Sequence, residues 1–112
     1  MATDKGAPYF SVIVPVYNRR GEVRDLLESL AKQTDDDFEL LLVEDGSTER
    51  CDDIAAAYAN QLRVQYFWKE NEGRSIARNY GIERAQGSYF IFFDSDCVIP
   101  PHYFEVLKKA LK

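Results

Sequence analysis

Apolar and polar positions recur along the chain with two alternating periods, and the change of period predicts strands and helices in turn. Four short runs are rich in β-branched and aromatic residues, which favour strands. These predicted strands are Tyr9–Val16, Phe38–Glu44, Val64–Trp68 and Tyr89–Phe93. Other segments place apolar residues three and four positions apart, as on one face of a helix. These predicted helices are Glu22–Lys32, Cys51–Asn60, Ser75–Gln86 and a last one after Pro100 and Pro101.

Strands that alternate with helices are typical of an α/β fold, in which right-handed crossovers join parallel strands. The second and fourth predicted strands are apolar almost throughout, which is expected where helices cover both faces of a sheet. Within the third predicted helix, Ala77, Gly81 and Ala85 recur every four residues, so this helix can lie close to the sheet or to another helix. Gly87 stands where the C-terminal cap of the same helix is expected.

Composition narrows the class of protein. A chain of 112 residues makes one domain at most. With 46% hydrophobic and 29% charged residues, it has the proportions of a soluble globular domain and not of a disordered or fibrous one. It carries 14 Lys and Arg against 19 Asp and Glu, a net charge of −5, which argues against binding to nucleic acid.

The expected location of the protein is the cytoplasm. Residues 1–8 are expected to form a flexible leader, and they lack the apolar core of a signal peptide. No apolar run approaches the roughly 20 residues of a membrane span, so any association with a membrane is expected to be peripheral. Cys51 and Cys97 fit no zinc spacing and are interpreted as reduced thiols, with one disulfide between them as the open alternative.

A small polar cluster follows each predicted strand. The four clusters are Tyr17–Arg20, Asp45–Ser47, Lys69–Arg74 and Asp94–Asp96. In an open parallel sheet, ligands bind in the crevice outside the carboxyl ends of the strands. The four clusters are therefore predicted to line one pocket.

Each cluster also has a purely structural interpretation. The carboxylates of Asp94 and Asp96 can hold Mg²⁺ or Mn²⁺, but an Asp-Ser-Asp sequence also suits a turn at a strand end. Asp45 can accept a hydrogen bond from a nucleobase, or it can simply begin a turn. Arg74, before the third predicted helix, can attract an anion. Arg78 lies near the same end of that helix, and its alternative is a surface ion pair.

Four motifs follow one another along nearly the whole chain. They are Phe10–Asn18 (FSVIVPVYN), Val43–Ser47 (VEDGS), Asn71–Gly73 with Ala77–Gly81 (ARNYG), and Phe93–Asp96 (FDSD). Together they resemble glycosyltransferase family 2 of the GT-A fold. The resemblance implies a Rossmann-like three-layer α/β/α architecture with a mainly parallel sheet in the strand order 3-2-1-4. Residues 9–112 are then expected to be the nucleotide-sugar-binding part of such a domain, without its acceptor-binding half.

The resemblance also implies a site for a nucleotide-diphosphate sugar, with uracil as the usual base. Its nucleotide-sugar-binding residues carry over to Pro15, Tyr17, Asn18, Asp45, Gly73, Arg78 and Asp94. In the family, the residues matching Pro15 and Tyr17 pack on the base and the residue matching Asp45 hydrogen-bonds it. Asp96, together with Asp94, is implied to bind Mn²⁺ or Mg²⁺, which stabilises the diphosphate as leaving group.

The implied reaction transfers a sugar, normally with inversion, to the hydroxyl of a saccharide or other acceptor. The catalytic base is expected beyond Lys112, so no residue is assigned to it, and Glu44 stands where the family usually has Asp. The alternative is a non-catalytic domain for nucleotide-sugar binding or assembly. In the implied strand order the strand at 89–93 lies at an edge. The chain is therefore predicted to be a fragment of a longer enzyme or to self-associate through that edge.

Overall fold

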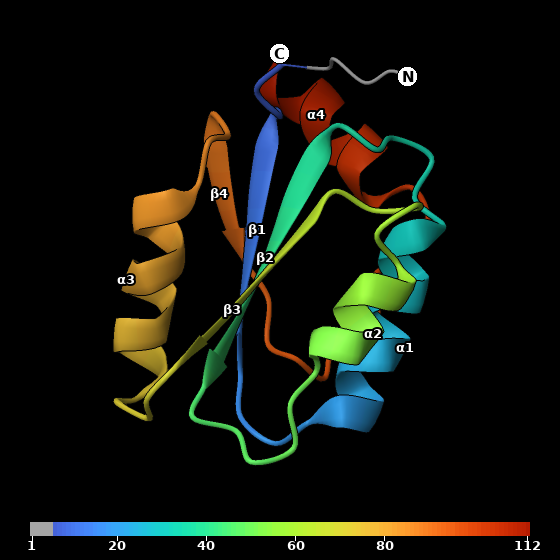
Figure 1. The fold of residues 1–112 in the computed structure, drawn as a ribbon. Helices are drawn as coiled ribbons and strands as arrows, with labels where there is room; N and C mark the ends of the chain where they lie inside the picture. Colours follow the sequence, from blue (N-terminus) through green and yellow to red (C-terminus); the bar gives the residue numbers. More distant parts are fainter. Residues whose placement is uncertain (1–5) are drawn as a thin grey trace.

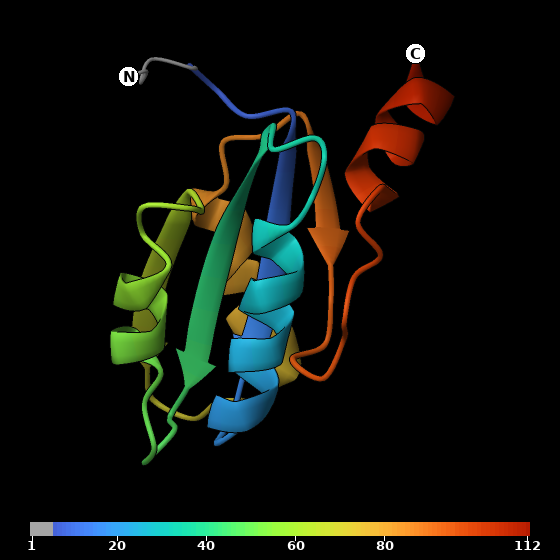
Figure 2. The same cartoon turned by 90° about the vertical axis from the view of Figure 1, so that its right-hand side faces the viewer.

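A computed structural model describes residues 6–112 as a four-stranded parallel sheet between two layers of helices (Figures 1 and 2). The elements are β1 (Phe10–Val16), α1 (Arg20–Ala31), β2 (Phe38–Asp45), α2 (Asp52–Ala57), β3 (Val64–Lys69), α3 (Arg74–Arg84), β4 (Tyr89–Phe92) and α4 (Tyr103–Leu111). The strand order is β3-β2-β1-β4, and every neighbouring pair is parallel. The predicted α/β fold and its strand order are confirmed. Residues 1–5 of the predicted leader lie outside the described residues.

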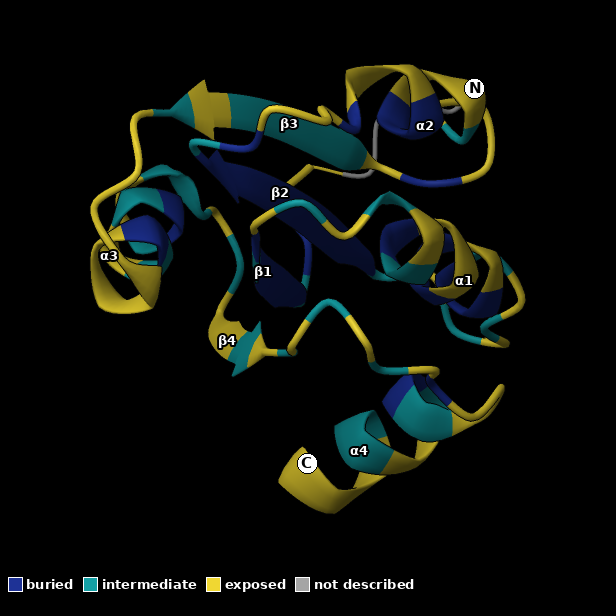
Figure 3. Cartoon of the chain, turned by 90° about the horizontal axis from the view of Figure 1, so that it is seen from below, coloured by how far each residue is buried: buried dark blue, intermediate teal, exposed yellow. Residues whose placement is uncertain are grey.

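The two helical layers are unequal. Helices α1, α2 and α4 lie on one face of the sheet, and α3 alone lies on the other (Figures 1 and 3). Helix α3 packs closely, because a Cβ on Gly81 would meet the side chain of Ile13 at 2.7 Å. Ala77 on the same face is fully buried. The small residues of this helix therefore serve the close packing that their spacing predicts.

Coverage of the sheet differs between its centre and its edge. Strand β2 is buried over its whole length. Strand β4 is not, since Phe90 and Phe92 are 42% and 43% exposed on the side of α3. Helix α3 packs mainly on β1 and β2. The interpretation that helices cover both faces is therefore right for β2 and wrong for β4, whose apolar residues reflect an open edge.

Two local predictions need correction. The helix predicted over Cys51–Asn60 is shorter, and only Asp52–Ala57 are helical before the chain enters a series of turns. Gly87 does not cap α3, which ends at Arg84. A Cβ on Gly87 would lie 2.7 Å from the backbone nitrogen of Ser11, so a glycine is required there by the close approach of two backbones.

No disulfide joins Cys51 and Cys97, and both are free thiols as predicted. Among the helices of residues 6–112, none is long and apolar enough to cross a bilayer.

Candidate functional site

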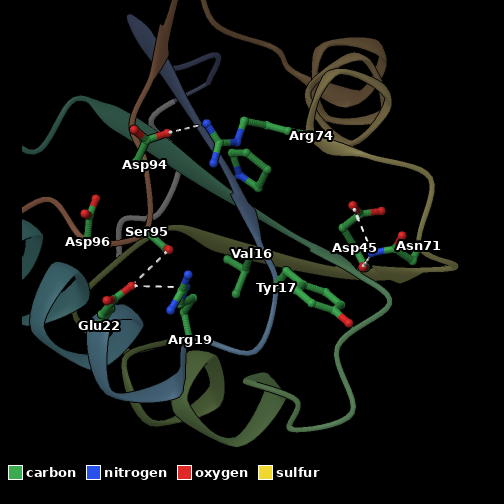
Figure 4. A pocket seen from close by; sticks show the side chains of 11 residues that line it. Val16, Tyr17, Arg19, Glu22, Asp45, Asn71, Arg74, Asp94, Ser95 and Asp96 are labelled. Carbon is green, nitrogen blue, oxygen red and sulfur yellow. Dashed lines mark hydrogen bonds and ion pairs between the residues drawn. The ribbon is translucent and has the colours of Figure 1, made fainter.

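A pocket of about 390 Å³ lies at the carboxyl ends of the strands (Figure 4). Its walls come from the ends of β1 and β2, the first turns of α1, the loop between β3 and α3, and the loop after β4. The lining residues are Pro15, Val16, Tyr17, Arg19, Glu22, Asp45, Asn71, Arg74, Asp94, Ser95 and Asp96. Each of the four strand-end clusters contributes at least one residue, so the predicted convergence on one pocket is confirmed.

Asp45 stands at the end of β2 and holds the loop between β3 and α3. Its carboxylate is nearly buried and accepts hydrogen bonds from the backbone N–H of Glu72 (2.8 Å) and of Gly73 (3.0 Å). Lys69, which pairs with Asp45 in the β2–β3 register, brings its ammonium group to 3.6 Å. The Glu72 carboxylate, 2.6 Å from that ammonium, raises the pKa of Lys69. Asp45 thus organises one wall of the pocket from inside the fold.

Gly46 allows the next turn to pass close to the same loop. Its φ is +80°, a conformation that favours glycine. A Cβ at this position would lie 2.7 Å from the backbone nitrogen of Asn71. The Asp45-Gly46 pair therefore makes the turn that its sequence suggests. The same turn lets the loop between β3 and α3 lie beside the end of β2.

Three of the expected binding residues do not line the pocket: Asn18, Gly73 and Arg78. The Oδ1 atom of Asn18 accepts hydrogen bonds from the backbone N–H of Thr48 and of Glu49, at 2.9 and 3.0 Å. Its own backbone N–H donates to the hydroxyl of Ser47 at 2.9 Å. Asn18 therefore joins the loops that follow β1 and β2, a role that its position after a strand does not reveal.

Glu44 is directed into the protein and away from the pocket. Its carboxylate accepts hydrogen bonds from the Tyr66 hydroxyl (2.9 Å) and from the backbone N–H of Cys51. Burial, and then this carboxylate, raise the pKa of the Cys51 thiol to about 12. Glu44 is a core residue that supports the start of α2.

The acidic loop after β4 faces arginines and also Glu22, a carboxylate that the sequence did not single out. Oδ1 of Asp94 lies 3.8 Å from the guanidinium of Arg74 (Figure 4). The hydroxyl of Ser95 lies 3.5 Å from Oε1 of Glu22, which is in turn 3.7 Å from Nε of Arg19. Glu22 was expected only as the start of a helix. No motif marks it, because its neighbours in the pocket are distant in sequence.

Asp96 differs from the other acidic residues of the pocket. Within residues 6–112, its exposed carboxylate has neither an ion pair nor a hydrogen bond. No group of three or more Asp, Glu, His or Cys side chains in the same part of the chain could hold a metal ion. A cation bound in this pocket would therefore take at most two of these side chains as ligands, and water or substrate would supply the others.

Comparison with known proteins gives a family and a fold. The sequence profile described as Glycosyl transferase family 2 matches residues 11–112. An uncharacterized glycosyltransferase of Rickettsia felis is 39% identical over 102 residues, which make up 91% of this chain and 17% of that protein. This chain thus spans less than a third of the relatives that it matches.

Solved structures agree with this result. S. aureus TarS 1–349 in complex with UDP superposes with a TM-score of 0.84 and 35% identity, over 89% of this chain and 31% of that one. The same protein in complex with UDP-GlcNAc gives a TM-score of 0.80. The mannosyltransferase PcManGT of Pyrobaculum calidifontis, in complex with GDP-Man and Mn²⁺, shares the fold at 24% identity, with a TM-score of 0.74 over 86% of this chain and 30% of that one.

Proposed function

The chain belongs to glycosyl transferase family 2, and on this premise we propose that its pocket binds the nucleotide-diphosphate sugar that donates the transferred sugar. The observation that carries the proposal is the convergence of four strand-end segments on one pocket that contains both acidic and arginine side chains. A pocket of this size suits a small-molecule ligand. The carboxyl ends of the strands are also where an open α/β sheet normally binds one.

The donor that we propose is a UDP-sugar. Tyr17 is 53% exposed at the mouth of the pocket, so its ring is free to stack on a base, with Pro15 beside it. Asp45 is assigned a hydrogen bond from the N–H of uracil. The complexes of TarS with UDP and UDP-GlcNAc support this choice of nucleotide. Asn18 and Gly73 contribute by shaping the loops around the ligand.

Asp94 and Asp96 are proposed to hold a divalent cation, Mn²⁺ or Mg²⁺. Their carboxylates are hard oxygen ligands, and Mg²⁺ typically takes only one or two carboxylates from a protein and completes its shell with phosphates and water. The donor set therefore fits such an ion when the diphosphate is also bound. When bound, the cation supplies Lewis-acid stabilisation of charge on the leaving diphosphate. Asp94 is also assigned to the ribose side of the nucleotide. Arg78 lies beside the nucleotide in this proposal, with its guanidinium 4.0 Å from the Asp94 carboxylate.

The reaction proposed for the whole enzyme is inverting transfer of the sugar to an acceptor hydroxyl. A carboxylate base is needed to take the proton of that hydroxyl. No residue up to Lys112 is assigned this role, and the relatives are much longer than this chain. The second candidate, nucleotide-sugar binding without transfer, is distinguished by an assay for sugar transfer to a panel of saccharide acceptors.

Calorimetric titration with UDP in the presence of Mn²⁺ tests the site. Wild-type chain should bind UDP, and Asp96→Ala should weaken binding about tenfold or more, because the cation loses its unpaired carboxylate. Asp25→Ala is the matched control, since it removes one exposed carboxylate of α1 outside the pocket. Absence of UDP binding, or equal binding by wild type and Asp96→Ala, contradicts the proposal.

Self-association through β4 is a separate proposal. The open edge carries two half-exposed phenylalanines, Phe90 and Phe92, with no charged residue within Tyr89–Phe92 to discourage pairing. Light scattering after size-exclusion chromatography should show dimers in wild type and monomers in Phe90→Lys. A wild-type chain that stays monomeric at high concentration rules this pairing out.

A further inference from the structure

We infer that Arg74 is a phosphate-binding residue of this site, whose guanidinium passes from Asp94 to the diphosphate when the donor binds. The inference rests on the proposed function and adds to it a contact that the family motifs do not assign.

Two arginines face the single carboxylate of Asp94. Nη1 of Arg74 lies 3.8 Å from Oδ1 of Asp94, and Nη2 of Arg78 lies 4.0 Å from the same oxygen. The pocket as a whole is acidic, with Glu22, Asp45, Asp94 and Asp96 in its lining, so its arginines are the groups that can meet an anion directly. Both distances exceed those of a good hydrogen bond, so these contacts leave the N–H donors of the arginines available. Arg74 can therefore donate hydrogen bonds to an anionic ligand.

The two arginines differ in their freedom to move. Arg74 lines the pocket, and its side chain is 65% exposed. Arg78 does not line it and is 37% exposed. Its Nε atom is buried without a hydrogen-bond partner, and its guanidinium lies 6.0 Å from the ring of Phe92. Arg78 is thus held against β4, where it can keep Asp94 paired while Arg74 turns to a ligand.

Arg19, the other arginine in the pocket, has a different partner. It lies 3.7 Å from Glu22 within the first turn of α1, and the proposed function gives Glu22 no contact with the donor. Arg74 instead faces Asp94, the carboxylate assigned to the ribose and the cation (Figure 4). When the donor binds, Asp94 therefore turns to the ribose and the cation, and a phosphate comes near Arg74. The planar fork of a guanidinium matches phosphate oxygens.

The test compares UDP with uridine on the 112-residue chain in the presence of Mn²⁺. UDP affinity is measured by calorimetry, and uridine affinity by ligand-observed NMR, which reaches millimolar binding. Arg74→Ala should weaken UDP binding about tenfold and leave uridine binding unchanged, because only the diphosphate is contacted. Arg74→Lys keeps the charge and loses the planar fork of the guanidinium. Its affinity for UDP should lie between those of the wild type and Arg74→Ala. Arg63→Ala is the matched control, an exposed arginine before β3 at the opposite end of the sheet.

Two outcomes overturn the inference alone: equal UDP binding by wild type and Arg74→Ala, or an equal loss of UDP and uridine binding in that variant. The second outcome indicates damage to the whole pocket. Failure of the wild-type chain to bind either ligand overturns the proposed function, and this inference with it.

Discussion

Replacing Asp45 by asparagine is the sharpest test of how the site is built. The carboxylate accepts two backbone hydrogen bonds, from Glu72 at 2.8 Å and Gly73 at 3.0 Å, one on each oxygen. An amide has only one oxygen, so in either orientation its NH₂ group meets one of these N–H donors. One hydrogen bond to a charged acceptor is lost, at about 1.5–3 kcal/mol, and the other loses its charge assistance. We expect Asp45→Asn to lower the free energy of unfolding by about 2–4 kcal/mol.

Urea unfolding, followed by the fluorescence of Trp68, measures this loss. Trp68 is the single tryptophan of the chain, and its indole N–H donates to the carbonyl of Ser47 at 3.1 Å, close to the affected loop. With a slope of about 2 kcal/mol per molar urea, the midpoint should fall by about 1–2 M. Asp94→Asn is the matched control, because its carboxylate is 55% exposed and, among residues 6–112, makes only the loose arginine contacts. It should change stability by less than about 0.5 kcal/mol.

A midpoint for Asp45→Asn within about 0.3 M of wild type would refute the reasoning. The carboxylate would then not be what holds the loop between β3 and α3, and Asp45 would have to be explained by ligand contact alone.

Two further predictions concern the same end of the molecule. Gly46→Ala should destabilise the fold by about 1–3 kcal/mol more than Gly73→Ala in thermal unfolding. Both glycines have positive φ, at +80° and +103°, but only at Gly46 would the new Cβ meet backbone, that of Asn71. Equal losses in the two variants would show that backbone strain alone matters. The second prediction concerns the thiols. Burial and the nearby Glu44 carboxylate raise the pKa of Cys51 to about 12, so it stays protonated at about pH 8 and iodoacetamide should modify Cys97 first. Equal labelling rates of the two cysteines in the folded chain, read by mass spectrometry, would contradict the burial of Cys51.

The sequence predicted the order of elements well because each element depends on local periodicity. The eight predicted segments correspond to the eight observed elements, and the boundaries differ most at α2. There, Asp52–Ala57 are too few residues for a stable helix on their own, so tertiary contacts decide where the helix ends. Coverage of the sheet was predicted less well. An apolar strand at an open edge and one buried in the centre have the same pattern, and only the placement of α3 distinguishes β4 from β2.

For the site, the sequence by itself determined which chemical groups stand at the strand ends, because parallel strands must bring their carboxyl ends to one rim. Only the tertiary structure decided what each group does there. Asp45 and Asp94 both stand near the carboxyl ends of strands, yet one is enclosed by backbone N–H groups and the other lies exposed between two arginines. Glu22 enters the pocket from a helix that carries no motif. Burial and partnership depend on contacts between residues far apart in the chain, and local patterns do not record them.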